Sequence, residues 1–239
     1  MDVTARVNEL MARQEPLLPE LEPYVDRSPL GWLLPYVTEI GLDRSRCALV
    51  NDRYRRTAER VRQHFEAEEF PSYIFAHERP HRLLAFIRCL PGLAGCTKGL
   101  VGADFGRVLR DVWLDCENVR QNRRLWRDVW RHDAEGRQHC MTAEERAALA
   151  AQPDRFIVWR GVSYFSSASI NGFSWTLDRD KAIWFARRHC SKRRRAWLAE
   201  GSVEKKDVLA HFLGRSEQEI VSLKVYPRVI IDVTDDHDQ

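Results

Sequence analysis

The stretch GFSWTLDRDKAIWFARRH, residues 172–189, decides the fold class, because the spacing of its apolar residues changes partway along it. Its first part, Gly172–Leu177, is a short run of aromatic and hydroxyl side chains between a glycine and an aspartate, which is typical of a strand. Asp178 can then cap a helix that extends to about His189, whose apolar residues recur at helical spacing. A strand followed at once by a helix predicts mixed α and β structure in this part of the chain.

Further short runs of β-branched or aromatic residues flank this stretch on both sides, and we interpret them as strands. They cover residues 156–159, 196–203, 219–225 and 229–233. We therefore expect an α+β fold, with a C-terminal domain over residues 151–239 that contains the strands.

Residues 1–150 show mostly helical periodicity, interrupted by prolines. The clearest predicted helix runs from Phe105 to about Arg131, and Thr142–Glu145 is a capping box that begins a shorter one. Arginine and tryptophan alternate over 123–131, so this helix is either part of the core or a basic platform for stacked bases, and tryptophans at helical spacing favour the core. We expect residues 1–150 to form a helical region that recognises a substrate or partner and packs on the C-terminal domain.

The overall composition is that of a folded globular protein, since 44% of the 239 residues are hydrophobic and 31% are charged. The formal net charge of +3 is below the strong positive bias of dedicated nucleic-acid-binding proteins. No apolar run approaches the roughly 20 residues that a membrane span needs, and the N-terminus does not resemble a secretory signal, so we expect a cytoplasmic protein. The six cysteines include no C-x-x-C pair, which predicts reduced thiols and no metal site.

Three short motifs occur in order in the C-terminal part of the chain: VWRG at 158–161, GFSWT at 172–176 and EQEI at 217–220. Each lies in or beside a predicted strand. Each alone has an ordinary structural interpretation, because an arginine beside a glycine, a strand with two hydroxyl side chains and two acids two residues apart are all common. The signal therefore lies in their joint occurrence and order.

In this order the motifs resemble those of the ADP-ribosyltransferase superfamily, in the class whose motif is arginine, then Ser-x-Ser/Thr, then glutamate, which includes many bacterial toxins. The resemblance covers about residues 153–233. It implies two small packed β-sheets with flanking helices. It also implies an enzyme that cleaves NAD at the nicotinamide–ribose bond and transfers ADP-ribose to a macromolecular acceptor, protein arginine or RNA. A toxin or phage-defence effector of this kind would have a partner such as an antitoxin or inhibitor protein.

The resemblance assigns roles to individual residues. It places Arg160, with the adjacent Gly161, against the pyrophosphate of NAD, because a guanidinium is a planar, permanently charged donor. Ser174 is then the hydroxyl that braces the catalytic carboxylate, and Thr176 is a second support on the same strand face. Glu219 is the catalytic residue, which stabilises the positive charge that develops on the ribose as nicotinamide leaves.

The acceptor is less sharply indicated by the sequence. Glu217 takes a position that in the family often goes with arginine as acceptor, whereas the basic segment Arg193–Arg195 would suit a polyanion. Trp175 departs from the family's usual serine, threonine, serine order, but its side chain should point to the other strand face. Tyr164 and Phe165 either stack on NAD or serve as packing residues.

Two alternative functions fit the same chain. One is a nucleic-acid-binding protein with an inactive transferase-like fold, which uses the predicted helix at 105–131 and the basic segment at 193–195. The other is an NAD glycohydrolase, which transfers ADP-ribose to water.

Overall fold

The computed structural model divides into two compact units. The first comprises Met1–Leu100 and Asp111–Glu117, and the second comprises Val101–Arg110 and Asn118–Gln239. The functional division at residue 150 stays a prediction, and the last helices before that residue belong to the same compact unit as the strands. The structure describes residues 2–24, 32–33, 38–39, 46–93, 99–116, 119–163, 167–188, 195–214 and 217–234.

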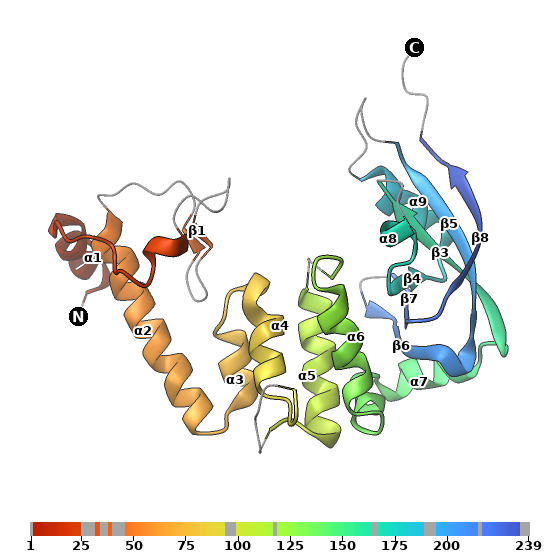
Figure 1. Ribbon diagram of the computed structural model, residues 1–239, viewed down its shortest axis with the longest axis horizontal. Coiled ribbons are helices and arrows are strands. Elements are labelled where there is room, and N and C mark those ends of the chain that lie inside the picture. Colours follow the sequence, from red (N-terminus) through yellow and green to blue (C-terminus); the bar gives the residue numbers. More distant parts are fainter. Residues whose placement is uncertain are drawn as a thin grey trace, which may run out of the picture. The chain divides into compact units, whose positions relative to one another are not determined.

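The first unit consists of helices and a short antiparallel hairpin (Figure 1). Asn51, buried on its longest helix, accepts a hydrogen bond from the backbone N–H of Leu18 at 3.0 Å and donates to the carbonyl of Pro16 at 2.8 Å. These bonds satisfy a buried amide and hold Pro16 and Leu18 against α2. The elements are α1 (Val3–Ala12), η1 (Glu22–Tyr24), β1 (Trp32–Leu33), β2 (Thr38–Glu39), α2 (Cys47–Glu66), α3 (Phe70–Phe75) and α4 (Arg79–Arg88); α5 (Gly102–Asp115) has residues in both units.

The second unit contains a six-stranded antiparallel sheet with the strand order β6-β7-β4-β3-β5-β8 (Figure 1). Its strands are β3 (Arg155–Val162), β4 (Ser174–Thr176), β5 (Trp197–Glu204), β6 (Val208–Phe212), β7 (Glu219–Ser222) and β8 (Tyr226–Asp232). Its helices are α6 (Arg123–His132), η3 (Gly136–Cys140), α7 (Ala143–Ala150), α8 (Ser167–Ile170), α9 (Arg179–Arg187) and η4 (Lys205–Asp207).

The predicted α+β class is confirmed, whereas the predicted pair of packed sheets is wrong. The strands form one sheet because Trp159 on β3 pairs with Thr176 on β4, which joins β6-β7-β4 to β3-β5-β8. The predicted helix over 105–131 is also wrong. It is two helices, since α5 ends at Asp115 and turns at 119–122 precede α6. The last of these turn residues is Asn122, a type that favours turns.

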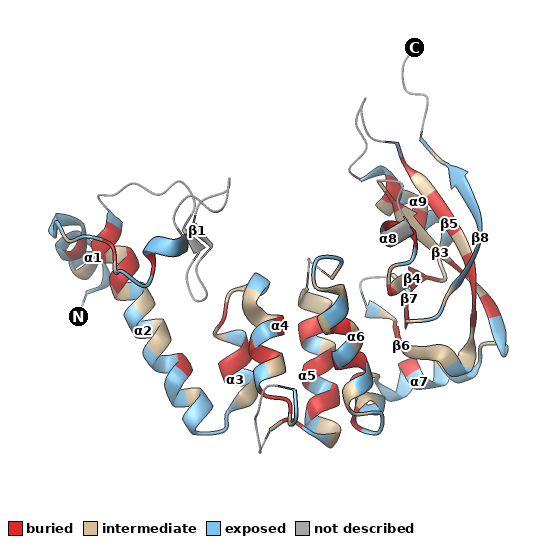
Figure 2. Ribbon diagram, viewed as in Figure 1, coloured by how far each residue is buried: buried red, intermediate tan, exposed pale blue. Residues whose placement is uncertain are grey.

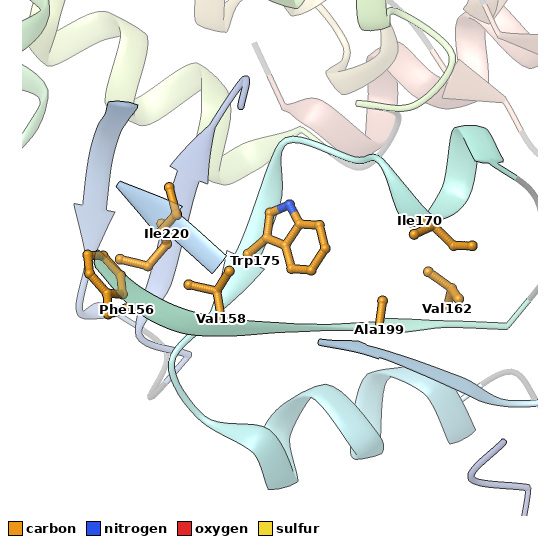
Figure 3. Close-up of a cluster of buried hydrophobic side chains, with 8 residues drawn as sticks. Phe156, Val158, Val162, Ile170, Trp175, Ala199 and Ile220 are labelled. Atoms are coloured by element: carbon orange, nitrogen blue, oxygen red, sulfur yellow. The ribbon is translucent and has the colours of Figure 1, made fainter. Parts of the chain in front are cut away.

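The buried centre of the sheet lies on one face (Figure 3). Trp175 on β4 is its largest side chain, and its Nε1 donates to the carbonyl of Gly172 at 2.9 Å, so the indole is buried without an unsatisfied donor. The cluster contains Phe156, Val158, Val162, Ile170, Trp175, Ala199, Val203 and Ile220. At the edge of the sheet, β8 is exposed along its whole length (Figure 2).

Helix α9 packs against β3, and a glycine allows the close approach. A Cβ at Gly161 would lie 2.0 Å from the carbonyl oxygen of Ala182 and 2.5 Å from the backbone nitrogen of Ala186. The predicted N-cap of this helix is confirmed, because the Asp178 carboxylate accepts from the N–H of Lys181 at 3.0 Å. The predicted end of the helix at residue 189 lies outside the described residues.

Candidate active site

The pairing of β4 with β7 brings the sequence-predicted hydroxyls and carboxylate together. Thr176 lies opposite Glu219, and Ser174 lies opposite Val221. Opposite residues in an antiparallel pair share a face, and so do alternate residues of one strand. Ser174, Thr176 and Glu219 therefore lie on one face of the sheet. Ser174 and Glu219 are half-buried, and Thr176 is buried.

Arg160 begins on the opposite face of the sheet. Alternation along β3 puts it in line with Val158 and Val162 of the core cluster. Its Nε donates to the carbonyl of Ser169 at 2.8 Å, and its Nη1 donates to the carbonyl of Ser174. Its Nη2 makes no hydrogen bond with the residues that the structure describes. The guanidinium thus holds the backbone that leads into β4 and keeps donors for a ligand.

The charge on Arg160 is set by its surroundings. Burial lowers the pKa of Arg160 to about 10, the Glu219 carboxylate opposes this shift, and Arg123 and Arg120 add to it. The residue stays positive at neutral pH. Gly172 leaves room for it, since a Cβ at residue 172 would lie 2.3 Å from the Cζ of Arg160.

Further arginines of α6 surround Phe173, the residue just before Ser174. The Cζ atoms of Arg123 and Arg127 lie 4.9 and 5.8 Å from the centre of the buried Phe173 ring. Burial, and then the charge of Arg127, lowers the pKa of Arg123, whose Nε is buried without a hydrogen-bond partner among the described residues. Neighbouring like charges of this kind favour binding of an anion.

The segment that carries the two glutamates has a strained backbone. Gln218, between Glu217 and Glu219, has a φ of 43°, in the left-handed region that few residues other than glycine adopt. Two hydrogen bonds from the end of β4 hold it: the Thr176 hydroxyl donates to the carbonyl of Glu217, and the N–H of Leu177 donates to the carbonyl of Gln218 at 3.2 Å. Backbone strain of about 1–3 kcal/mol is often found at functional sites.

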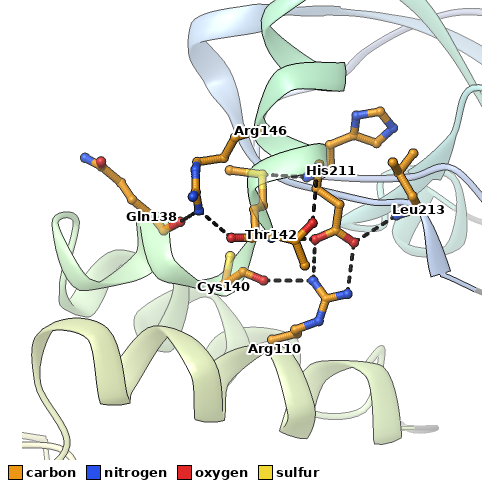
Figure 4. A network of polar contacts seen from close by, with 9 residues as sticks. Arg110, Gln138, Cys140, Thr142, Arg146, His211 and Leu213 are labelled. Carbon is orange, nitrogen blue, oxygen red and sulfur yellow. Dashed lines mark hydrogen bonds and ion pairs between the residues drawn. The ribbon is translucent and has the colours of Figure 1, made fainter.

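A buried ion pair anchors the other side of this segment (Figure 4). Glu145 on α7 accepts from Nη1 and Nη2 of Arg110 at 2.5 and 2.9 Å. It also accepts from the backbone N–H groups of Thr142 and Leu213 at 2.9 and 3.1 Å. Since Leu213 directly follows β6, this carboxylate fixes the start of the connection that leads to Glu217.

The remaining predicted site residues are placed as follows. Gly161, predicted beside NAD, lies against α9. Tyr164, Phe165, Arg193 and Arg194 lie outside the described residues, and Arg195 pairs with Asp232 at 3.0 Å on the surface.

The basic and apolar faces of α6 have separate roles. Trp126 and Trp130 are fully buried, so their interpretation as core residues is confirmed and they are not a platform for stacked bases. No motif in the sequence connects Arg123 and Arg127 with Arg160. The spacing of four residues between Arg123 and Arg127 does predict that both lie on one face of a helix.

The described residues contain no group of three or more histidine, cysteine, aspartate or glutamate side chains placed to hold a metal ion. None of the helices in the described part of the chain is long and apolar enough to span a membrane.

Comparisons of the chain with models of protein families, with curated proteins and with solved structures find no match.

Proposed function

We propose that this chain is an ADP-ribosyltransferase that cleaves NAD at the nicotinamide–ribose bond and transfers ADP-ribose to a macromolecular acceptor. The observation that carries the proposal is the register of β4 and β7. It sets the half-buried Glu219 directly opposite Thr176 and on the face of Ser174. Arg160 starts from the other face of the sheet, and its guanidinium lies within electrostatic reach of Glu219. The third motif is well separated in sequence from the first two, and the pairing of β4 with β7 supports a common site.

In this proposal the cationic group binds the dianionic pyrophosphate of NAD. The Nη2 donors of Arg160 contact one phosphate, and the neighbouring charge of Arg123 adds to the attraction. The buried ring of Phe173, which Arg123 and Arg127 contact, keeps the α6 charges in place. Donors that are fixed before the ligand arrives need no reorganisation on binding, which favours affinity.

Glu219 then acts on the ribose. A fixed carboxylate beside the ribose stabilises the positive charge that grows as the bond to nicotinamide breaks. In the proposal, Ser174 supports this carboxylate from the same face of the neighbouring strand, while the Thr176 hydroxyl holds the backbone of Glu217. In the proposal, Glu217, next to the strained Gln218, orients or deprotonates an incoming acceptor.

The test is nicotinamide release and label transfer from NAD labelled in its adenylate part. Glu219→Gln should slow nicotinamide release several hundred-fold, because one such electrostatic group is worth about 3–4 kcal/mol. Glu217→Gln should reduce transfer more than nicotinamide release. The matched control is Glu144→Gln, an exposed glutamate on α7, which should leave both rates unchanged. Equal turnover by wild type and Glu219→Gln would refute the proposal.

The same experiment identifies the acceptor and separates the alternatives. Removal of the label by protease indicates protein, by nuclease indicates RNA, and release of free ADP-ribose indicates an NAD glycohydrolase. A wild-type chain without NAD turnover that binds nucleic acid is the inactive, nucleic-acid-binding alternative. As part of the transferase proposal, we propose a toxin or phage-defence role in the cytoplasm, with an antitoxin or inhibitor protein as partner. The test of this role is whether expression of the wild-type chain arrests growth and expression of Glu219→Gln does not.

A further inference from the structure

The first unit contains a basic groove between α2 and α3, and no residue of the candidate active site lines it. Its volume is about 460 Å³, within the range of roughly 300–1,000 Å³ for pockets that hold small ligands. All of its lining residues are described and belong to one compact unit. They are Arg53, Arg56, Thr57, Arg60, Phe75, Ala76 and Glu78.

Three arginines form a stripe along one wall of the groove. Arg53, Arg56 and Arg60 are three and four residues apart on α2, so they follow one helix face over about 10 Å. All three are exposed. The lining includes one carboxylate, Glu78, so the groove carries an excess of positive charge.

Neighbouring acids neutralise Arg56 and Arg60 only in part. Arg56 pairs with Asp52 at 2.7 Å, but Asp52 also accepts from Arg6 at 2.6 Å. One carboxylate therefore serves two guanidinium groups. Arg60 forms no ion pair with any residue in the described part of the chain. Arg56 and Arg60 therefore retain positive charge for an anionic ligand.

An aromatic side chain lies at the other wall. Phe75, the last residue of α3, is 36% exposed and lines the groove. The Cζ of Arg82 lies 5.1 Å from the centre of its ring, and Arg82 is held in turn by Asp115. The ring is thus fixed on the protein side while part of it stays accessible. A guanidinium stripe beside an accessible aromatic ring is the usual composition of a site for single-stranded nucleic acid.

We propose that this groove binds single-stranded nucleic acid, with phosphates on Arg53, Arg56 and Arg60 and a base on Phe75. A duplex fits poorly, because its bases are stacked inside and cannot reach the ring. An acidic peptide would use the arginines but leave Phe75 without a partner. The inference does not depend on the transferase proposal, because no residue of the candidate active site takes part.

The test is fluorescence anisotropy of the full chain with labelled RNA and DNA oligonucleotides of about 12 nucleotides, from about 50 to 300 mM KCl. Each phosphate contact on a single strand contributes about 0.7 to the slope of log affinity against log salt. Arg53→Gln, Arg56→Gln and Arg60→Gln combined should therefore flatten the slope by about 2. Phe75→Leu should weaken binding by about 5- to 150-fold and leave the slope unchanged.

A second triple variant removes the same charge elsewhere. Arg13, Arg62 and Arg107 are exposed and each pairs with a nearby carboxylate outside the groove. Their replacement by glutamine should leave the slope within about 0.5 of wild type. Circular dichroism melting shows whether each variant is folded, and Phe75→Leu provides an independent measurement if the groove triple is not.

Four outcomes would overturn the inference. They are no binding by wild type at the lowest salt, equal flattening in the two triple variants, tighter binding of a duplex than of either single strand, and displacement by polyglutamate as effective as displacement by the unlabelled oligonucleotide. The last result would indicate an acidic protein as the ligand.

Discussion

Replacing Glu145 by glutamine removes a buried charge that holds Leu213, just after β6, and the start of α7. The carboxylate is 3% exposed, accepts two hydrogen bonds from Arg110 and receives two more from backbone N–H groups. Loss of one partner from a fully buried ion pair costs about 3–5 kcal/mol. The Arg110 side chain is 23% exposed, so water recovers part of this loss, and glutamine keeps one acceptor oxygen. We expect a loss of about 2–3 kcal/mol in the free energy of unfolding.

The pH dependence gives a second, independent measure of the same interaction. Burial acts to raise the pKa of Glu145, but the bonds from Arg110 and the backbone outweigh it, and its pKa lies below the ordinary value. A lowered pKa in the folded state means that the stabilisation is complete above the unfolded-state pKa and is lost as pH falls through the folded-state value. The difference between wild type and Glu145→Gln should therefore be constant near neutral pH and shrink below about pH 4.

The assay is urea unfolding followed by circular dichroism at pH 7 and at several acidic values. Glu144→Gln is the matched control, because Glu144 is the exposed neighbour on the same helix. If the free energy of unfolding of Glu145→Gln lies within about 0.5 kcal/mol of that of Glu144→Gln, the reasoning is refuted. It is also refuted if the difference in free energy of unfolding between wild type and Glu145→Gln stays the same as the pH is lowered. If the variant folds, NAD turnover should fall as well, because Leu213 loses its anchor.

Three further changes test separate parts of the sheet and site. Gly161→Ala should lower the free energy of unfolding by about 2–3 kcal/mol in urea titrations, because its Cβ would overlap the carbonyl of Ala182; unchanged stability would contradict the close packing of α9. Arg123→Gln should raise KM for NAD about tenfold with little change in kcat, and an effect on kcat alone would exclude a binding role. Thr176→Val should cost about 1–2 kcal/mol of stability, because the bond to the carbonyl of Glu217 is lost; a change below about 0.5 kcal/mol would show that this bond does not hold the segment.

Features that depend on local chemistry were predictable from the sequence. The N-caps at Asp178 and Thr142 are confirmed because each needs only a side chain two or three residues from a free N–H. The burial of the α6 tryptophans follows in the same way from helical spacing. The arrangement of the sheet was not predictable, because the pairing of Trp159 with Thr176 joins segments whose separation carries no periodic signal. β6 was also missed, since VLAHF is short and alternates weakly.

The candidate site was predictable in its residue types but not in its geometry. The motifs named Arg160, Ser174 and Glu219, and the register explains how Ser174 and Glu219 come to share a face. The contacts of Arg160 with backbone carbonyls, and its proximity to Arg123, arise from tertiary packing between α6 and the loop before β4. No pattern within either segment indicates the other.

The two halves of the sheet meet where Trp159 on β3 pairs with Thr176 on β4. Next to this pair, the side chain of Arg160 on β3 makes a further link, because its guanidinium donates to the carbonyl of Ser174 on β4. The Arg160 side chain thus links the β6-β7-β4 half of the sheet to the β3-β5-β8 half. Without it, the amides around β4 should exchange with deuterium through a local opening while those of β5 remain protected. A ligand that binds Arg160 would then change how often β4 separates from β3, and so the protection of the amides around β4.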